Sequence, residues 1–374
     1  MSLSNLLQEK ENHFIASVQR MNKSGLPLVL YGAGCLGQMT WEFMKRENMP
    51  LDLVALNRAY IKPDTKFHDL DIVAIEDLVE GAQGFNCIVA LQQIDNELIN
   101  YLSRRASEVL IYDPAFIGVN TEIWYSAEFC KENALLLNGL YDSLADDKSR
   151  ETLVAFLNQR ISAKRGNYGS VYEPVHYFPT DIVALQDGET FVDCGAYDGD
   201  SINAFMRAVA KQDVAQPESV IGFEPDKGNF TKLLKNTEHL PFSTCVNKGV
   251  WEHDSVLYFQ SGQALSSRLI EEEVSGESIV LTSIDNLLQG KAATFIKMDV
   301  EGAEYNALKG AENTIRNHRP LLAISVYHKP EDLLTIPQLL QSFCPGYHFF
   351  LRGHHPELAF ELVLYAVPEE RNLG

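Results

Sequence analysis

The sequence predicts an α/β protein with two separate, mostly parallel sheets flanked by helices. Short apolar strands alternate with helix-like segments between residues 25 and 120, and the same alternation returns after residue 181. In both regions a strand runs directly into a glycine-containing turn and then a helix. This pattern is typical of a doubly wound sheet that binds a ligand at its carboxyl edge.

Composition indicates a globular protein and disfavours two classes of partner. The chain has 374 residues, of which 45% are hydrophobic and 22% charged, so we expect two or three domains with real cores. The net charge of −20 disfavours nucleic acid and anionic membrane surfaces, because both require basic patches. The acidic run Glu271–Glu273 is interpreted as a solvated face.

Cysteine usage and the N-terminus indicate a cytoplasmic protein. The six cysteines are scattered without a CxxC pair, which fits reduced thiols better than a disulfide framework or a zinc site. Residues 1–10 are polar and lack a signal-peptide core, and no apolar run approaches the roughly 18 residues of a membrane span. A homo-oligomer is compatible with these features.

Residues 1–24 are expected to hold an N-terminal helix, over 6–20, and residues 25–120 a Rossmann-like domain of the nucleotide-binding type. A buried strand at 26–31 leads into Gly32, Gly34 and Gly37, which form a GxGxxG sequence, and then into a helix that ends near residue 45. Further strands are expected at 51–56, 71–73, 87–91 and 108–112, with a helix at 76–80.

The GxGxxG turn is a candidate second nucleotide site, because a helix N-terminus can bind a pyrophosphate. The dinucleotide fingerprint also requires an acid at the end of the second strand, and here that strand ends in Asn57 and Arg58. Asn57 could bond a hydroxyl and Arg58 could favour a phosphate. The alternative is that the glycines only allow close packing of helix against strand. The segment loosely resembles Rossmann-like domains on some sugar-modifying bacterial proteins.

The most informative stretch is 191–201, which predicts a strand, a tight turn and a helix. Gly195 and Gly199 let the backbone turn sharply and approach a ligand, and the helix N-terminus offers free N–H groups. Three aspartates crowd the turn, namely Asp193, Asp198 and Asp200. They would repel a pyrophosphate but suit a cationic, hydroxyl-rich ligand such as S-adenosylmethionine.

A second acid supports the same cofactor. Residues 219–226 predict a buried strand that ends in Glu224, about 30 residues beyond Asp193. An acid at this position accepts hydrogen bonds from both ribose hydroxyls. A third strand is expected at 243–246, and the turn at Gly249 that follows it would lie beside an adenine. Another strand is expected at 255–259.

The remainder of this region continues the same pattern. Residues 293–305 predict a strand, an acidic turn and the start of a helix that runs to Ile315. A buried strand at 320–326 precedes Tyr327 and His328, and a terminal strand is expected at 358–367.

Three motifs make the region from residue 181 to the C-terminus resemble the FkbM family of S-adenosylmethionine-dependent methyltransferases. They are FVDCGAYDGDS, GFEPD, and IKMDVEGAEYNALKGAENTI with the spaced RPLLAISVYH; the most specific part is 297–310. The resemblance implies a class I methyltransferase fold, with a seven-stranded, mostly parallel sheet and an antiparallel last strand. It also implies O-methylation, often of sugar or polyketide hydroxyls. Many members have VDVGAN where this chain has Cys194 and Tyr197, but the acid and the glycines are retained.

The resemblance implies both a cofactor site and an acceptor. The cofactor-binding residues would be Asp193, Gly195, Ala196, Tyr197, Asp198, Glu224, Pro225, Gly249, Val250 and Asp299. The acceptor would be a small molecule or a glycan. Because a hydroxyl must lose its proton, a base is expected near the carboxyl ends of the strands.

The candidate catalytic residues are Asp299, Glu301 and His328, with Lys297 as an electrostatic partner for an alkoxide. His328 is the first choice for the base, because the unperturbed pKa of histidine lies near neutrality. Asp299, Glu301, Glu304 and His328 could also form an oxygen-rich divalent site. Nothing in the sequence fixes their geometry, so no metal is expected.

Two polar segments have open roles. Residues 121–180 predict a helical connector, with helices at 126–140 and 149–163 and an aromatic end that contains Tyr172, His176, Tyr177 and Phe178. This end is either a packed linker or a lid whose aromatic face lies near a sulfonium. Arg352, His354 and His355 form a polar loop that is either solvated or faces the substrate.

Two other functions compete with methyl transfer. The first is an NAD(P)-dependent oxidoreductase built on the GxGxxG domain, which the missing acid and the lack of a Tyr-x-x-x-Lys pair disfavour. The second is a non-catalytic protein that senses a nucleotide. The retained acids Asp193, Glu224 and Asp299 disfavour it.

Overall fold

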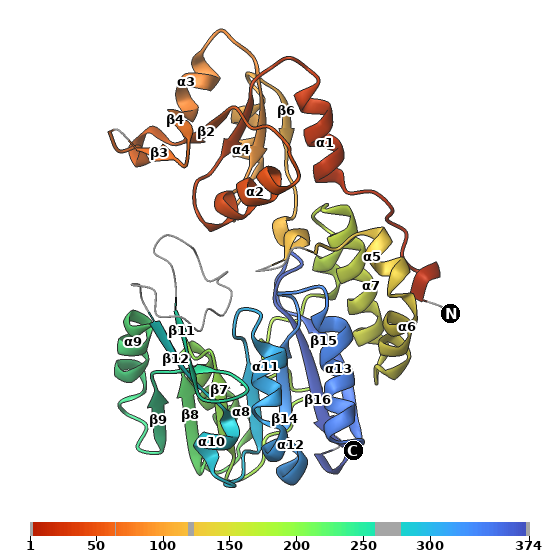
Figure 1. Ribbon diagram of the computed structural model, residues 1–374, viewed down its shortest axis with the longest axis vertical. Coiled ribbons are helices and arrows are strands. Elements are labelled where there is room, and N and C mark those ends of the chain that lie inside the picture. The colour runs from red at the N-terminus through yellow and green to blue at the C-terminus, as the bar shows by residue number, and fades with distance from the viewer. Residues whose placement is uncertain (1–2, 64, 119–122, 259–277, 372–374) are drawn as a thin grey trace.

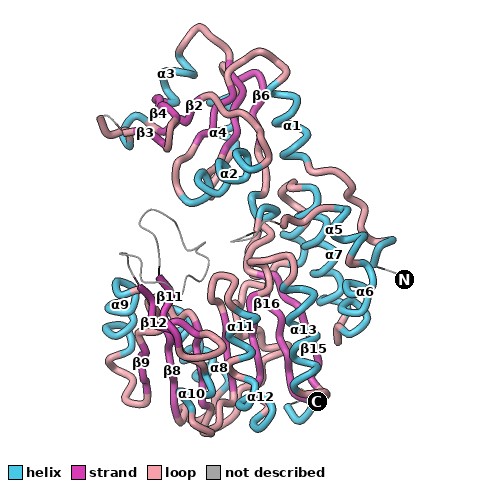
Figure 2. The backbone as a smooth tube through the Cα atoms, in the orientation of Figure 1, coloured by secondary structure: helices cyan, strands magenta, loops and turns pink. Residues whose placement is uncertain are grey.

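The computed structural model of this chain describes residues 3–63, 65–118, 123–258 and 278–371. It contains a six-stranded sheet from the first part of the chain and a seven-stranded sheet from the last part (Figure 1). Helices flank the strands of both sheets (Figure 2). None of the helices within these ranges combines the length and the apolar character that a bilayer crossing requires. Glu271–Glu273 and the last residue of the strand expected at 255–259 lie outside the described residues.

The first sheet has the strand order β3-β4-β2-β1-β5-β6, and every pair except β3–β4 is parallel. Its strands are β1 (Leu28–Tyr31), β2 (Leu53–Leu56), β3 (Lys66–Phe67), β4 (Leu70–Ala74), β5 (Phe85–Val89) and β6 (Ala106–Leu110). Its helices are α1 (His13–Asn22), α2 (Cys35–Arg46), α3 (Ile75–Glu80) and α4 (Asn96–Leu102). The short strand β3 and helix α4 were not predicted.

The N-terminal helix is shorter than predicted. It begins at His13 and not near residue 6, because the Asn12 side chain accepts the N–H of Ile15 at 3.1 Å and caps the helix there. Leu3 and Leu7, which precede the cap, pack into the core that the connector helices share with the seven-stranded sheet.

The connector consists of α5 (Ala127–Glu132), α6 (Ala134–Ser143) and α7 (Asp147–Ser162). The single helix predicted over 126–140 is interrupted at Asn133, where ψ is 18° and the side chain bonds back to the Phe129 carbonyl. Apolar residues of all three helices belong to the same core as strands of the seven-stranded sheet. The connector is therefore packed against that sheet.

The seven-stranded sheet has the order β15-β16-β14-β13-β7-β8-β9. Its strands are β7 (Thr190–Cys194), β8 (Ser219–Phe223), β9 (Ser243–Val246), β13 (Phe295–Met298), β14 (Leu321–Ser325), β15 (Tyr347–Gly353) and β16 (Leu362–Pro368). Only β16 runs antiparallel to its neighbours in the sheet. This confirms the seven-stranded, mostly parallel sheet with an antiparallel last strand.

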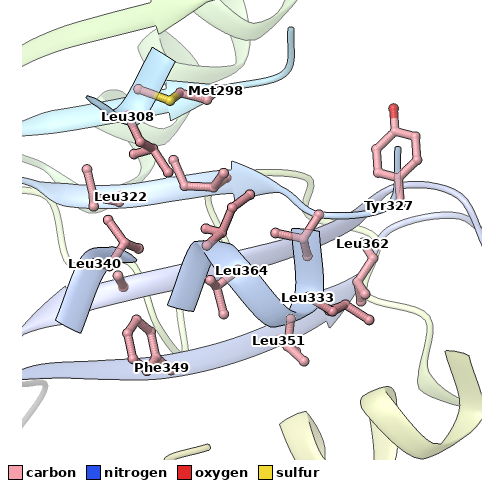
Figure 3. Close-up of a cluster of buried hydrophobic side chains, with 14 of the residues drawn as sticks. Met298, Leu308, Leu322, Tyr327, Leu333, Leu340, Phe349, Leu351, Leu362 and Leu364 are labelled. Carbon is pink, nitrogen blue, oxygen red and sulfur yellow. The ribbon is translucent and has the colours of Figure 1, made fainter. Parts of the chain in front are cut away.

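Alternate residues of each strand enter two different cores, as expected for a sheet covered on both faces. On one face Phe191 and Phe295 pack against α8 (Asp200–Gln212) and α9 (Lys227–Thr237). On the other face lie α10 (Ile284–Leu288), α11 (Glu304–Lys309), α12 (Glu312–His318) and α13 (Asp332–Phe343). Figure 3 shows Leu333 and Leu340 of α13 against strand residues such as Leu364.

Two details of this half differ from the prediction. The helix expected from Glu304 to Ile315 is divided into α11 and α12 near Gly310, where a Cβ atom would lie 2.1 Å from the Trp251 carbonyl oxygen. Gly249 lies not in a turn but in β10 (Gly249–Val250), which joins β12 (Ser278–Thr282) and β11 (Ser255–Tyr258) in a three-stranded sheet.

Candidate active site

The candidate site lies at the carboxyl edge of the parallel strands, where turns from distant parts of the sequence meet. Glu224 directly follows β8, Asp299 directly follows β13, and His328 follows β14 by three residues. The turn after β7 is fixed to its neighbour, because the N–H groups of Gly195 and Ala196 both donate to the Phe223 carbonyl, at 3.1 and 2.8 Å.

Gly195 is required by both conformation and space. Its φ is +83°, and a Cβ atom would lie 1.9 Å from the Asp299 carbonyl oxygen. Tyr197 also has a positive φ, of 48°, and its side chain is largely exposed. Gly199, with φ +93°, precedes the first turn of α8. The turn thus presents backbone groups at the sheet edge.

Glu224 faces this turn. One of its carboxylate oxygens accepts the Tyr197 N–H at 2.9 Å, and the other accepts the Asp226 N–H at 2.8 Å. Each oxygen keeps a further lone pair for a ligand donor. Burial raises the pKa of Glu224, although the two N–H donors favour its ionised form.

Asp193 and Lys297 form a buried ion pair beneath the turn. They are directly opposite each other in the β7–β13 register, with Lys297 Nζ 3.0 Å from Asp193 Oδ1. Lys297 also donates to the Gly195 carbonyl at 2.8 Å, and the Ser201 hydroxyl donates to Asp193. Burial lowers the pKa of Lys297, but the carboxylates of Asp193 and Asp299 raise it overall.

This pairing changes the role that the sequence suggested for both residues. Asp193 was expected to touch the cofactor and Lys297 to face an alkoxide, yet their side chains are only 0% and 3% exposed. The two side chains contact each other, and Lys297 also bonds to the Gly195 carbonyl of the turn. The structure therefore places them as supports of the turn and not on its ligand-facing side.

Asp299 is held as an ionised hydrogen-bond acceptor. Its Oδ2 accepts the Tyr177 hydroxyl at 2.7 Å, and its Oδ1 lies 3.5 Å from His328 Nε2. Burial alone would raise the pKa of Asp299, but the charges of His328 and Lys297, together with the Tyr177 hydroxyl, lower it. Asp299 is therefore a weak base.

His328 is fully buried between carboxylates. Its Nδ1 lies 3.0 Å from Glu304 Oε1, which also accepts the Val300 N–H, while its Nε2 lies 3.6 Å from Glu301. Burial would lower the pKa of His328, but Glu304, with Asp299 and Glu301, raises it to about 10. At neutral pH the ring is thus a charged donor, so it cannot accept a proton as the sequence analysis expected.

The same cluster is the one place, among the described residues, where a group of at least three metal-ligand side chains converges. One potential ligand atom from each of Asp299, Glu304 and His328 lies within 4.8 Å of the others. Metal binding requires a neutral imidazole, whereas here the imidazolium already balances the carboxylates. The absence of a metal stays a prediction.

The sequence analysis missed Glu361 and did not fix the roles of its neighbours. The His176 ring stacks on Tyr177, with centroids 3.7 Å apart, and on His354 at 4.6 Å. Glu361 Oε2 lies 3.5 Å from His176 Nε2. One signal was available: Glu361 directly precedes the antiparallel strand β16, which begins at the carboxyl edge of its parallel neighbours.

The polar loop at 352–355 is structural in part. Arg352 is buried and pairs with Asp146 and Asp181, at 2.6 and 2.8 Å. The His354 ring nitrogens bond to the Glu173 carbonyl and the Tyr365 hydroxyl, both at 2.8 Å. Arg352 therefore ties β15 to the connector, while His355 Nδ1 accepts two backbone N–H groups and so holds the loop between β15 and β16.

The GxGxxG turn precedes α2 as predicted. A Cβ atom on Gly32 would lie 2.6 Å from the Ala90 carbonyl oxygen, and one on Gly37 would lie 2.1 Å from the Gly32 carbonyl oxygen. Packing thus explains these two glycines, but Gly34 has no atom within 4 Å of its Cβ position. Asn57 accepts the Tyr31 hydroxyl at 2.8 Å. Nucleotide binding at this turn stays a prediction.

Comparison with known proteins agrees with this geometry. Residues 193–347 match the family described as "Methyltransferase FkbM domain". The crystal structure of methyltransferase FkbM from Methylobacillus flagellatus KT matches with a TM-score of 0.68 at 23% identity, over 97% of this chain and 97% of that chain. No curated protein sequence matches the chain.

Two further solved structures match about half of the chain at lower similarity. Fibrillarin from Aeropyrum pernix, with natively bound S-adenosyl-L-methionine, has a TM-score of 0.32 at 10% identity, over 50% of this chain and 70% of that chain. An rRNA methylase from Streptococcus thermophilus has a TM-score of 0.31 at 12% identity, over 49% of this chain and 87% of that chain. By its motifs, its sheet order and its family match, residues 193–347 form a methyltransferase domain of the FkbM family.

Proposed function

We propose that this chain is an S-adenosylmethionine-dependent O-methyltransferase that acts on a hydroxyl of a sugar, a glycan or a related natural product. The observation that carries the proposal is Glu224, which faces the Gly195 turn within an FkbM methyltransferase domain and keeps acceptor capacity for two hydroxyls.

The residues at the sheet edge fit this cofactor. The free lone pairs of Glu224 suit a ribose diol, and the backbone of the Gly195 turn can approach a ligand closely. Gly249 and Val250 are buried, and a Cβ atom on Gly249 would lie 2.7 Å from Leu281 and 3.8 Å from Pro225, so we propose that this apolar segment borders the base. The residues proposed to hold the cofactor are Gly195, Ala196, Tyr197, Asp198, Glu224, Pro225, Gly249, Val250 and Asp299. When bound, it supplies an electrophilic methyl group.

The chain's own contribution would be to position the acceptor and to take its proton. A hydroxyl held in line with the methyl group gains much of its rate from orientation alone. Asp299 is ionised and anchored by Tyr177, so we propose that it orients the acceptor or the cofactor through hydrogen bonds. Lys297 would act on this step indirectly, through the turn that it supports.

A polyhydroxylated acceptor is supported by the side chains around Asp299. Glu301 and Glu361 offer carboxylate acceptors, with side chains that are 57% and 32% exposed. The chain's net charge of −20 disfavours an RNA substrate. An oxidoreductase based on the GxGxxG domain is not favoured, because the acid expected after β2 is absent and Asn57 is already bonded to Tyr31.

Calorimetric titration with S-adenosylhomocysteine, and separately with NADH, tests the proposal. We expect micromolar binding of the former, weakened about 10- to 100-fold by Glu224→Ala, because hydrogen bonds to a charged group are lost. The matched control is Glu218→Ala, at the exposed opposite end of the same strand, which should bind like the wild type. Binding of NADH alone would overturn the proposal. If S-adenosylhomocysteine binds, transfer of labelled methyl groups to a panel of sugars then identifies the acceptor class.

A further inference from the structure

We propose that Glu361 is the residue that removes the proton from the acceptor hydroxyl. This inference rests on the proposed function and assigns the base that its chemistry needs. The observation behind it is a row of contacting side chains at the carboxyl edge. Asp299 accepts the Tyr177 hydroxyl, Tyr177 stacks on His176, and His176 lies 3.5 Å from Glu361.

The position of Glu361 follows from the topology of the last strand. Because β16 is antiparallel to β14, its first residues lie where β14 ends, and the Val326 N–H donates to the Leu362 carbonyl at 2.9 Å. Glu361 therefore lies beside the segment that leads to His328, on the same edge as Asp299. Its φ of +54° is unusual for a residue with a side chain, and such backbone strain is concentrated at functional sites.

The neighbour of Glu361 is a buried ring nitrogen that does not hold the carboxylate in a hydrogen bond. His176 Nε2 is buried and has no hydrogen-bond partner among the described residues, although it lies 3.5 Å from Glu361 Oε2. The Glu361 side chain is 32% exposed, so a ligand can reach it. A hydroxyl that approaches the exposed side of Glu361 could donate a hydrogen bond to its carboxylate.

The loop that carries Glu361 is held from several sides. Arg160 of α7 donates to the Ala359 carbonyl at 2.9 Å and to the Tyr327 carbonyl at 2.8 Å. Asp113, which precedes the 3-10 helix after the first sheet, accepts the Ala359 N–H at 2.7 Å. This loop is thus fixed relative to the end of β14, as a catalytic base requires.

The surrounding charges give Glu361 a different pKa from the other candidate bases. The titratable groups that act on it come from the connector, from the region of β13 and from the end of β14: Tyr168, His176, Tyr177, Lys297, Asp299, Glu301, Tyr327 and His328. Burial and the charge of Asp299 raise the pKa of Glu361 to about 7, against the weaker opposite effects of His328 and Lys297. Burial lowers the pKa of His176 to about 3, so that ring is neutral.

Among Asp299, His328 and Glu361, these protonation states favour Glu361 as the proton acceptor. Asp299 is too weak a base, and His328 already carries its proton. In the reaction the acceptor oxygen forms its bond to the methyl carbon, the carbon–sulfur bond of the donor breaks with its electron pair left on sulfur, and the hydroxyl proton moves to a Glu361 oxygen. The carboxyl group then releases this proton to solvent through its exposed face.

The first test does not depend on the acceptor. The protein is labelled with ¹³C at glutamate carboxyl carbons, and the signal that is absent from Glu361→Gln is followed with pH, without cofactor. We expect this carboxyl group to titrate near pH 7. Titration near the ordinary value of about 4.3 would overturn the inference.

The second test measures methyl transfer to the acceptor found in the sugar screen. Glu361→Gln should lower kcat by about 10²- to 10⁴-fold and remove the acidic limb of the pH profile, while the affinity for S-adenosylhomocysteine stays unchanged. The matched control is Glu357→Gln, in the same loop, whose side chain is 62% exposed and which should behave like the wild type. Equal rates in wild type and Glu361→Gln would refute the role of Glu361 alone. Failure of the wild type to bind S-adenosylhomocysteine would refute the proposed function instead.

Discussion

Replacing Lys297 by methionine should destabilise the methyltransferase domain far more than an ordinary lysine substitution. The change leaves the Asp193 carboxylate buried without its counter-charge, while the methionine keeps most of the side-chain volume. Breaking a buried pair by removing one partner costs about 3–5 kcal/mol. For a domain of this size, that corresponds to a fall in melting temperature of about 6–20 °C.

The ion pair of Lys309 and Glu252 provides a matched control within the same domain. Its N–O distance is 2.5 Å, shorter than the 3.0 Å of the buried pair, but its side chains are 44% and 28% exposed. Exposed pairs contribute about 0–1 kcal/mol, so Lys309→Met should change the melting temperature little. The comparison tests whether burial determines the loss of stability, because the exposed pair has the shorter N–O distance but should contribute less to the free energy of unfolding.

Thermal unfolding followed by far-ultraviolet circular dichroism measures both variants. The double variant Asp193→Asn with Lys297→Met should recover part of the loss, because no charge then remains buried. Loss of the Lys297 bond to the Gly195 carbonyl should also weaken S-adenosylhomocysteine binding about tenfold or more. If Lys297→Met unfolds within about 1 kcal/mol of the wild type, the reasoning on the buried pair is wrong.

Three other predictions follow from single contacts. Gly37→Ala should destabilise the first sheet region, whereas Gly34→Ala should leave its melting temperature nearly unchanged, because only Gly37 has a carbonyl oxygen against its Cβ position. The raised pKa of His328 stabilises the fold fully below pH 6.5, and this stability is lost as the pH rises through about 10. Melting temperatures should therefore fall over this pH range in the wild type and in the exposed control His253→Asn, but less in His328→Asn. Asp113→Ala removes the acceptor of the Ala359 N–H in the Glu361 loop, so it should lower kcat of methyl transfer without changing the affinity for S-adenosylhomocysteine. The control Asp95→Ala removes a helix cap elsewhere and should affect stability only. A kcat for Asp113→Ala equal to that of the wild type would contradict the last prediction.

Four strands of the second sheet could be recognised from the sequence because their determinants are local. β7, β8, β13 and β14 are short apolar runs, and the residues that end them are polar or conformationally special. α13 was missed because it contains Pro337, which normally interrupts a helix. β15 was missed because its sequence Tyr347–Gly353 includes histidine, arginine and glycine.

The site could be predicted only where one strand and its own turn define it. Glu224 was identified in this way, because its place at the end of β8 follows from the local pattern alone. The pairing of Asp193 with Lys297 depends on β13 lying next to β7, which sequence order does not reveal. The charge on His328 likewise depends on Glu304, which reaches it from a separate helix. Asp193, Lys297 and His328 were therefore assigned other roles from the sequence, because their partners lie on neighbouring strands or helices.

The proposed acceptor side of the site is built by parts of the chain outside the parallel strands. Tyr177 and His176 come from the connector, and the Glu361 loop is held by Arg160 and Asp113. The proposed cofactor side is formed by turns of the sheet itself, so its position follows from the fold. Substitutions in the connector and in the Glu361 loop should therefore alter the choice and the deprotonation of the acceptor while cofactor binding is retained. On this proposal, the choice of acceptor is tested by varying residues around His176 and Glu361, and cofactor binding by varying those around Glu224.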